Sequence, residues 1–329
     1  MGDLLTHDFP RRDHLLRPWL RQGESVLVWA PTGIGKTMLS LTIALATAGG
    51  GSFLGWSAGP PRRVLLVDGE MHAEDLRDRL AMLAGTVAGI DAEAAAGNLA
   101  VISRQFQGGD VRFPDIAERE ADDREPGQEM VIREAQRIGA ELVILDNLST
   151  LAELPDENDA AAMTPVVTLL MRLKAAGIAC VLVHHSGKTG GSYRGSSKLA
   201  TTFEVIIGLR KLEGHTPGDG AAFELHWEKY RGAPSSVVRD AVVRLGGGPG
   251  GPQWEREAVP EDDVETLLEA ARTGSFASQR AIAQDLGWGE RKVSVMKDRA
   301  IRQGRITADE WAGLLAGRDV SSDIAKPRF

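Results

Sequence analysis

The eight residues from Ala30 to Thr37, APTGIGKT, constrain the fold of this chain more than any other segment. An apolar run at 25–29 precedes them, and a run with helical character at 38–48 follows. When a strand enters a glycine-rich turn and leaves it as a helix, the backbone N–H groups of the turn and the positive end of the helix dipole face one point. The segment therefore predicts a phosphate-binding P-loop.

Within this turn the residues have separate expected roles. We expect Lys36 to reach the β- and γ-phosphates of ATP and the Thr37 hydroxyl to bind Mg²⁺. The pattern G-x-x-x-x-G-K-[ST] begins with glycine, whereas this chain has Ala30, which restricts the backbone there but adds only one methyl group. The predicted nucleotide-binding residues are Pro31, Thr32, Gly33, Ile34, Gly35, Lys36, Thr37 and Met38.

Composition limits the class of protein. A chain of 329 residues is long enough for one large core and an appendage, because single cores stop growing near about 250–300 residues. The 38 Lys and Arg residues against 46 Asp and Glu residues give a net charge of −8, which argues against a uniformly basic surface but permits a local basic patch.

The single cysteine, Cys180, lies in an apolar run and is expected to be buried. The sequence has neither a signal-peptide pattern nor an apolar stretch near the roughly 18 residues that would span a bilayer, so we expect a cytoplasmic protein that does not bind membranes.

Strand and helix patterns alternate after the P-loop. Short apolar runs at 64–67, 100–102, 142–145 and 178–183 predict buried strands, and helical spacing at 73–84, 130–139 and 163–176 separates them. This alternation predicts an α/β fold with a mostly parallel sheet covered on both faces. The polar, Gly- and Pro-punctuated stretch 104–128 predicts a surface loop.

The organisation changes after residue 204. Strand patterns at 204–211, 222–229 and 237–245 are closely spaced and joined by turn sequences, which predicts terminal antiparallel hairpins. The glycine- and proline-rich stretch 246–254 predicts a flexible boundary. We therefore expect an ATPase domain at 1–245, a linker at 246–260 and a small, mainly helical domain at 261–329.

Two carboxylates follow predicted buried strands. Asp146 is expected at the carboxyl end of its strand, where it can hold a Mg²⁺-bound water beside Thr37. Glu70, in the run Asp-Gly-Glu-Met, is expected to polarise the attacking water as general base. Two alternatives stay open: Asp68 is the second candidate for the base, and acidic residues at this place also cap helices.

The pair His184–His185 ends another strand. Adjacent strand residues point to opposite faces, so at most one of the two is expected to contact the γ-phosphate and report its loss to the following loop.

Together these motifs resemble the RecA-fold ATPases of the hexameric replicative helicase group, most closely the plasmid RepA type, over roughly residues 15–245. The resemblance implies a RecA-like P-loop NTPase core, a homo-oligomeric ring of six subunits, and single-stranded DNA as partner. It implies that Glu70 activates water and that His185 or its neighbour couples the phosphate to a DNA-binding loop. The motifs that carry it are Pro18-Trp-Leu, APTGIGKT, Asp68-Gly-Glu-Met, Leu145-Asp146, His184-His185-Ser186, Arg194-Gly-Ser-Ser-Lys198 and Glu228-Lys-Tyr-Arg-Gly232.

The last motif places two cations, Lys229 and Arg231, two residues apart on a strand, so both project from one face. The resemblance implies that they reach the ATP site of a neighbouring subunit as a lysine and an arginine finger. The alternative is an ordinary exposed strand that carries two cations.

The segment 187–198 is rich in glycine and hydroxyl residues and carries Lys188, Arg194 and Lys198. The resemblance implies that it faces a central channel and grips the backbone of single-stranded DNA. A solvated loop without this role is the alternative.

The C-terminal region resembles a winged helix-turn-helix. Ser278 is expected to cap a short helix, and a turn at 287–289 leads to a second helix at 290–304. This recognition helix is expected to place Arg291, Lys292 and Lys297 against duplex DNA, with Arg299 and Arg302 also exposed. From residue 255 onward, however, 12 Lys and Arg residues face 14 Asp and Glu residues, a net charge of −2. Docking on a replication protein or on the ring itself is therefore the alternative.

Three functions share this predicted site. The first is an ATP-driven ring helicase on single-stranded DNA, the second a DNA-bound regulatory or loader ATPase without unwinding, and the third a nucleotide-switched protein-binding module. Fold alone does not separate them. Single-stranded DNA is expected to accelerate ATP hydrolysis by the first, specific duplex by the second, and neither by the third.

Overall fold

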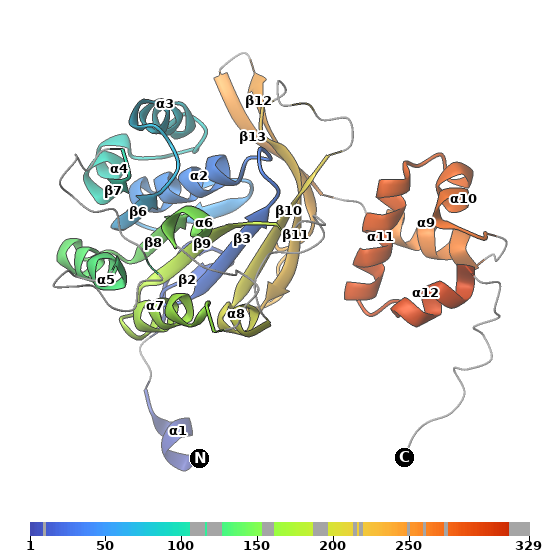
Figure 1. The fold of residues 1–329 in the computed structure, drawn as a ribbon, viewed down its shortest axis with the longest axis horizontal. Coiled ribbons are helices and arrows are strands. Elements are labelled where there is room, and N and C mark those ends of the chain that lie inside the picture. The colour runs from blue at the N-terminus through green and yellow to red at the C-terminus, as the bar shows by residue number, and fades with distance from the viewer. Residues whose placement is uncertain are drawn as a thin grey trace. The chain divides into compact units, whose positions relative to one another are not determined.

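A computed structural model of the chain describes residues 1–8, 11–105, 116, 127–152, 161–186, 197–212, 216, 220–248, 251–258, 261–272 and 276–315. The chain divides into two compact units, Met1–Glu257 and Ala258–Phe329. Figure 1 shows both units. The loop expected at 104–128 lies largely outside the described residues, and the helix after it begins at Gly127, earlier than expected.

A nine-stranded sheet forms the centre of the larger unit, in the order β13-β12-β11-β10-β3-β9-β8-β6-β7. The six strands from β10 to β7 are parallel, and β11 and β12 continue the sheet antiparallel. This is the α/β architecture that the sequence predicts. The strands are β3 (Ser25–Ala30), β6 (Val64–Asp68), β7 (Leu99–Ser103), β8 (Leu142–Asp146), β9 (Ala179–His185), β10 (Val205–Lys211), β11 (Ala222–Tyr230), β12 (Ala241–Gly248) and β13 (Gly251–Ala258).

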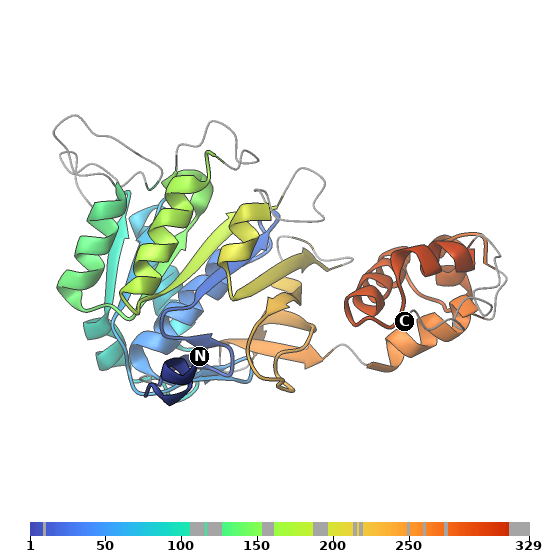
Figure 2. The same ribbon diagram turned by 90° about the horizontal axis from the view of Figure 1, so that it is seen from below.

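Helices cover both faces of this sheet (Figures 1 and 2). Side chains alternate along β3, so Val26 and Val28 pack into one core and Leu27 and Trp29 into the other. The first core includes α2 (Lys36–Gly49), α3 (Ala73–Ala84) and α4 (Ala92–Asn98), and the second includes α5 (Gly127–Ile138), α6 (Leu148–Leu151) and α7 (Thr164–Ala175). Two short helices, α1 (Gly2–Thr6) and α8 (Ser197–Thr202), complete the unit. None of the described helices is both long and apolar enough to cross a bilayer.

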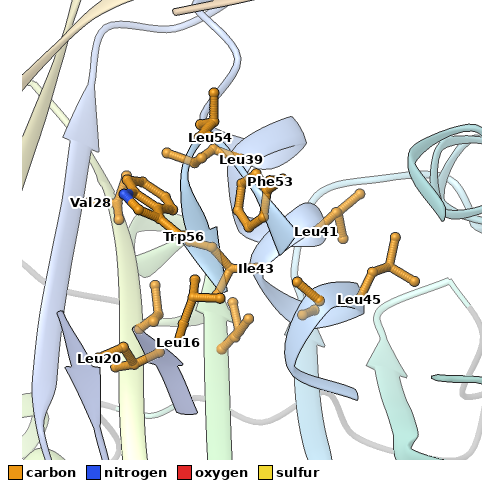
Figure 3. Packing of buried hydrophobic residues seen from close by; sticks show 14 of the residues in the cluster. Leu16, Leu20, Val28, Leu39, Leu41, Ile43, Leu45, Phe53, Leu54 and Trp56 are labelled. Carbon is orange, nitrogen blue, oxygen red and sulfur yellow. The ribbon is translucent and has the colours of Figure 1, made fainter. Parts of the chain in front are cut away.

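A second, four-stranded sheet packs against α2 and was not expected. Its strands are β1 (His14–Arg17), β2 (Leu20–Arg21), β4 (Ser52–Phe53) and β5 (Trp56–Ala58), in the order β2-β1-β5-β4. Figure 3 shows Phe53 and Trp56 beside Leu39 and Ile43 of α2. Strands of two to four residues are too short to give an alternating pattern, so the sequence carries no signal for this sheet.

The expected linker at 246–260 is wrong over most of its length, because β12 and β13 occupy it. Trp254 of β13 donates from Nε1 to Thr42 Oγ1 of α2 at 3.1 Å. Its ring also lies 6.1 Å from Phe223 and 6.4 Å from Phe53, measured between centroids. Glycine and proline suggested a flexible boundary, but the tryptophan fixes this strand against the P-loop helix. The ATPase unit therefore extends to Glu257 instead of ending at residue 245.

The C-terminal unit contains four helices in its described residues, α9 (Glu261–Arg272), α10 (Gln279–Asp285), α11 (Glu290–Arg302) and α12 (Ala308–Leu315). Ser278 caps α10 as predicted, since its Oγ accepts the Ala281 N–H at 3.2 Å. The pair α10–α11 has the helix-turn-helix order. The expected wing is not found among the described residues of this unit, because the chain after α11 forms α12 and buries Trp311 instead of pairing as strands.

Candidate nucleotide-binding site

The turn between β3 and α2 has the backbone conformation of a P-loop. Gly33 and Gly35 have φ values of +80° and +117°, in the region that favours glycine. A Cβ on Gly35 would lie 2.7 Å from the Ala221 Cβ, so both conformation and space require glycine there. Ala221, directly before β11, therefore lies against the turn.

Lys36 begins α2 and is only 6% exposed. Its Nζ donates to the carbonyl oxygens of Ala30 at 3.1 Å and Pro31 at 2.9 Å. Burial lowers the pKa of Lys36, while the carboxylates of Asp146 and Glu70 raise it. The ammonium group thus lies at the turn, in the electrostatic field of both predicted carboxylates.

Asp146 ends β8 and is buried. Ser40 Oγ donates to its Oδ2 at 2.7 Å, and the Thr37 hydroxyl also donates to this carboxylate. Burial raises the pKa of Asp146, and these two hydrogen bonds and the charge of Lys36 oppose that rise. The sequence predicted that Thr37 and Asp146 meet, but gave no signal for Ser40, which is one helical turn further along α2.

Glu70 is exposed and is held by a residue that sequence analysis missed. Asn147 Nδ2 donates to Glu70 Oε2 at 2.6 Å. The Asn147 side chain is buried, and its Oδ1 has no hydrogen-bond partner among the described residues. The only signal for Asn147 was its place directly after Asp146 at the end of a buried strand.

Asp68, the alternative base, has a different environment. Its Oδ2 accepts the Met71 N–H at 3.1 Å, which stabilises the turn that leads to α3. Burial is the main cause that raises the pKa of Asp68 to about 6. Glu70 lines the cavity described next, whereas Asp68 does not.

A cavity of about 460 Å³ lies beside the P-loop, and Lys36, Thr37, Glu70 and Asn147 line it. His185 lines it from the end of β9, while His184 is fully buried, as expected for neighbours on a strand. Of the predicted P-loop residues, Ile34 instead packs into the hydrophobic core. The cavity is lined by Thr32, Gly33, Gly35, Lys36, Thr37, Met38, Glu70, Met71, Arg79, Asn147, His185, Gly220 and Ala221.

Arg79 is a cation of this cavity that no motif indicated. It projects from α3, and its Nη1 lies 3.2 Å from Met71 Sδ. Its position on the first helix after Glu70 gave no sequence signal, because helical surfaces often carry arginine.

The two predicted fingers lie at the other edge of the sheet. Tyr230 pairs with Val205, and Val205 pairs with Val26 at the start of β3, whereas the P-loop follows the end of β3. Lys229 Nζ donates to the Ala200 carbonyl at 2.8 Å. The Arg231 side chain is 57% exposed, and its Nη1 lies 3.8 Å from Glu204 Oε1. Neither residue lines the cavity of its own chain.

The predicted DNA-binding residues are only partly described. Lys188 and Arg194 lie outside the described residues, and Lys198 lies in α8 with a side chain that is not described. In the C-terminal unit, Lys292 lies 4.0 Å from the centroid of the Trp288 ring and 3.1 Å from Asp263.

The other predicted cations of α11 differ in exposure. Arg291 is partly exposed, and Lys297 pairs with Asp298 at 3.2 Å. Arg299 is only 4% exposed, which corrects the expectation of a solvent-facing side chain. It lies between Met296 and Ala300 on the helical sequence and packs with them on the inner face.

Comparison with known proteins agrees with this architecture. The family described as an AAA domain matches residues 1–191, more than half of the chain. The structure is similar to that of a KaiC-like protein from the hyperthermophilic archaeon Pyrococcus horikoshii OT3, with a TM-score of 0.50, 19% identity, and coverage of 74% of this chain and 99% of that one. No curated protein matches the chain.

Proposed function

The chain belongs to the AAA domain family, and on that premise we propose that it is a ring-forming, ATP-hydrolysing DNA helicase or translocase of the replicative RepA type, acting on single-stranded DNA. One observation carries the proposal. The P-loop and Glu70 line one cavity, and the buried Asp146 accepts hydrogen bonds from Ser40 and from Thr37 of that cavity, while Lys229 and Arg231 lie at the opposite edge of the same sheet. Such a chain binds ATP alone but requires a second copy to bring those two cations to it.

ATP binding follows from the turn and its lysine. Backbone N–H groups of the P-loop and the N-terminus of α2 attract the phosphates, and the ammonium group of Lys36 neutralises part of their charge. The residues suited to Mg²⁺ are Thr37 and Asp146, because hydroxyl and carboxylate oxygens are the donors that this ion prefers. The unpartnered Oδ1 of Asn147 adds an oxygen acceptor beside them. Mg²⁺, when bound, supplies charge neutralisation on the phosphate oxygens.

Hydrolysis requires a base at the end of the triphosphate. The Glu70 carboxylate accepts a proton from the attacking water, and the 2.6 Å hydrogen bond from Asn147 fixes its orientation. Glu70 is exposed and lines the cavity, whereas Asp68 is buried outside it and uses its Oδ2 to accept the Met71 N–H. This difference supports Glu70 as the base.

The negative charge that develops in the transition state requires nearby cations. Lys229 and Arg231 do not line the cavity of their own chain, so they cannot supply this positive charge there. In a ring, Lys229 and Arg231 of one subunit meet the γ-phosphate bound by the next and stabilise the charge that develops there. His185 at the wall of the cavity then senses loss of the phosphate and passes it to the segment that begins at residue 187, which holds the DNA through Lys188, Arg194 and Lys198.

A second candidate is a regulatory ATPase bound to duplex DNA, favoured by the helix-turn-helix order of α10 and α11. Arg291, Lys292 and Lys297 are its proposed contacts. Two of these already pair with neighbouring carboxylates, Lys292 with Asp263 and Lys297 with Asp298, which weakens their attraction for phosphate. We therefore rank this function second. A replication protein is the alternative partner that we propose for the C-terminal unit.

The deciding experiment measures the assembled mass and the ATPase rate of the full chain with Mg²⁺, alone, with single-stranded DNA and with duplex DNA. The proposal expects an ATP-dependent ring, hydrolysis accelerated by single-stranded DNA, and displacement of a labelled strand. Acceleration by duplex alone would favour the second candidate. A monomer that hydrolyses ATP at full rate under every condition would refute the ring mechanism.

A further inference from the structure

The stretch formed by α8 and the two residues between α8 and β10 contacts both predicted fingers. Glu204 follows α8 and is 8% exposed. Its Oε2 accepts the Ser25 N–H at 2.9 Å, which ties the carboxylate to the first residue of β3. Its Oε1 faces Arg231 at 3.8 Å and also accepts a hydrogen bond from Lys174 Nζ of α7. Lys229 bonds the carbonyl of Ala200 in the same stretch.

This arrangement differs from a simple surface ion pair. The two oxygens of Glu204 have different partners, so one oxygen anchors the carboxylate to the backbone of β3 and the other presents charge toward the end of β11. Because that second oxygen also pairs with Lys174, it holds Arg231 at a longer distance and only by electrostatic attraction. The Arg231 guanidinium is therefore oriented by Glu204, yet its side chain remains 57% exposed to solvent.

We propose that Glu204 is a positioning residue for the trans-acting Arg231. It restricts the guanidinium to the region at the end of β11 before the neighbouring subunit arrives, so less side-chain entropy is lost when the finger meets the γ-phosphate. Lys174 neutralises the same carboxylate, which keeps its hold on Arg231 weak enough for release. This inference rests on the proposed function, since it requires Arg231 to act on a second copy.

The test compares Glu204→Gln with Glu24→Gln. The side-chain amide of the Glu204→Gln variant keeps an oxygen that can accept the Ser25 N–H, but it lacks the negative charge that faces Arg231. Glu24 is a matched control, because it is 9% exposed, lies one residue before Ser25, and pairs with Arg12 instead of Arg231. We expect kcat of Glu204→Gln to fall by about ten- to a hundredfold with KM for ATP nearly unchanged, since misplacing a catalytic group costs rate more than substrate binding. Glu24→Gln is expected to keep the wild-type kcat.

Mixing subunits identifies the defect as one in the finger. Glu204→Gln has an intact cavity, so mixing it with Lys36→Ala, which keeps an intact finger, is expected to restore hydrolysis at the shared interfaces. If Glu204→Gln does not fold, Glu204→Asp keeps the charge and is expected to lose less than tenfold in kcat while remaining rescued by Lys36→Ala. Equal kcat for Glu204→Gln and Glu24→Gln, or a mixture without rescue, overturns the inference. Arg231→Ala separates a failure of the proposed function from a failure of this inference. If Arg231→Ala hydrolyses ATP normally, both fail. If Arg231→Ala is inactive while Glu204→Gln is normal, only the positioning role of Glu204 fails.

Discussion

The two edges of the central sheet differ in how much of their chemistry one chain completes. At the carboxyl ends of the parallel strands, Asp146 and Glu70 each have a fixed hydrogen-bond donor, so this site is already organised within one chain. At the other edge, Lys229 contacts Ala200 and Arg231 faces Glu204. Neither cation lines the nucleotide cavity of its own chain. Under the proposed function, such a chain separates ATP binding from ATP turnover, and each edge is expected to be disabled without the other.

Lys36→Ala is expected to have the largest effect, because it acts at the edge that binds. Removing the ammonium group leaves the phosphate charge without its main neutralising side chain, so nucleotide binding and hydrolysis are both lost. Titration with a fluorescent ATP analogue measures this. Lys211→Ala removes an exposed cation at the end of β10 and is expected to bind normally. Unchanged affinity in Lys36→Ala would mean that the cavity is not the nucleotide site.

Arg231→Ala tests the other edge. We expect kcat to fall by about 10³ to 10⁵, the range that arginine fingers contribute, while affinity for ATP stays within a few-fold of the wild type. Arg12→Ala is the control, because it removes an exposed guanidinium that pairs with Glu24 instead of Glu204. Steady-state hydrolysis and nucleotide titration together separate turnover from binding. Normal turnover in Arg231→Ala would show that the two edges do not cooperate between subunits.

Glu70→Gln sharpens the comparison within the binding edge. The amide oxygen still accepts the hydrogen bond from Asn147, but it cannot take a proton from water, so kcat is expected to fall by about 10² to 10⁴ with binding retained. Single-turnover hydrolysis with quantified ADP measures the chemical step directly. A larger loss in Asp68→Asn than in Glu70→Gln would assign the base to Asp68.

The sequence predicted the binding edge better than the rest because P-loop chemistry is local. The spacing from Ala30 to Thr37 and the apolar runs before Asp68 and Asp146 place these residues on successive parallel strands, and parallel strands end at one edge. Ser40, Asn147 and Arg79 were missed because each reaches the site through tertiary packing and matches no pattern of its own. The register of β10 and β11, which separates Arg231 from the P-loop, likewise comes from strand pairing that no single segment encodes.

The errors outside the site have a common origin in composition. Glycine and proline near residue 250 resemble a linker, yet Trp254 there forms a hydrogen bond to Thr42 and joins an aromatic cluster. The helical pattern after residue 278 fitted a winged domain, but the chain continues into α12 instead of a described strand pair. In both places one tryptophan packs against the core of its unit, the partly buried Trp254 in the first and the buried Trp311 in the second, and a single large side chain has little weight in a compositional average.

Of these variants, Asp68→Asn is expected to have the smallest effect, which is a change in the free energy of unfolding. It measures the free energy lost when the buried Asp68 carboxyl becomes charged. Burial raises the pKa of Asp68 from 3.8 to about 6, so the folded state binds this proton more tightly than the unfolded chain does. The stability gained from that proton is fully present below about pH 3.8 and is lost as the pH rises through about 6. The variant has no such loss. Its free energy of unfolding, relative to the wild type, is therefore expected to increase by about 1–3 kcal/mol between pH 4 and pH 8.

Urea denaturation at the two pH values measures this difference, and Asp75→Asn is its control. Asp75 is exposed in the first turn of α3, so its substitution measures how stability changes with pH when no buried carboxyl is removed. If Asp68→Asn gives no larger change between pH 4 and pH 8 than Asp75→Asn does, Asp68 ionises as freely in the folded protein as in the unfolded chain. The binding edge would then be organised without burying an acidic proton, and its contrast with the exposed cations of the opposite edge would rest on hydrogen bonding alone.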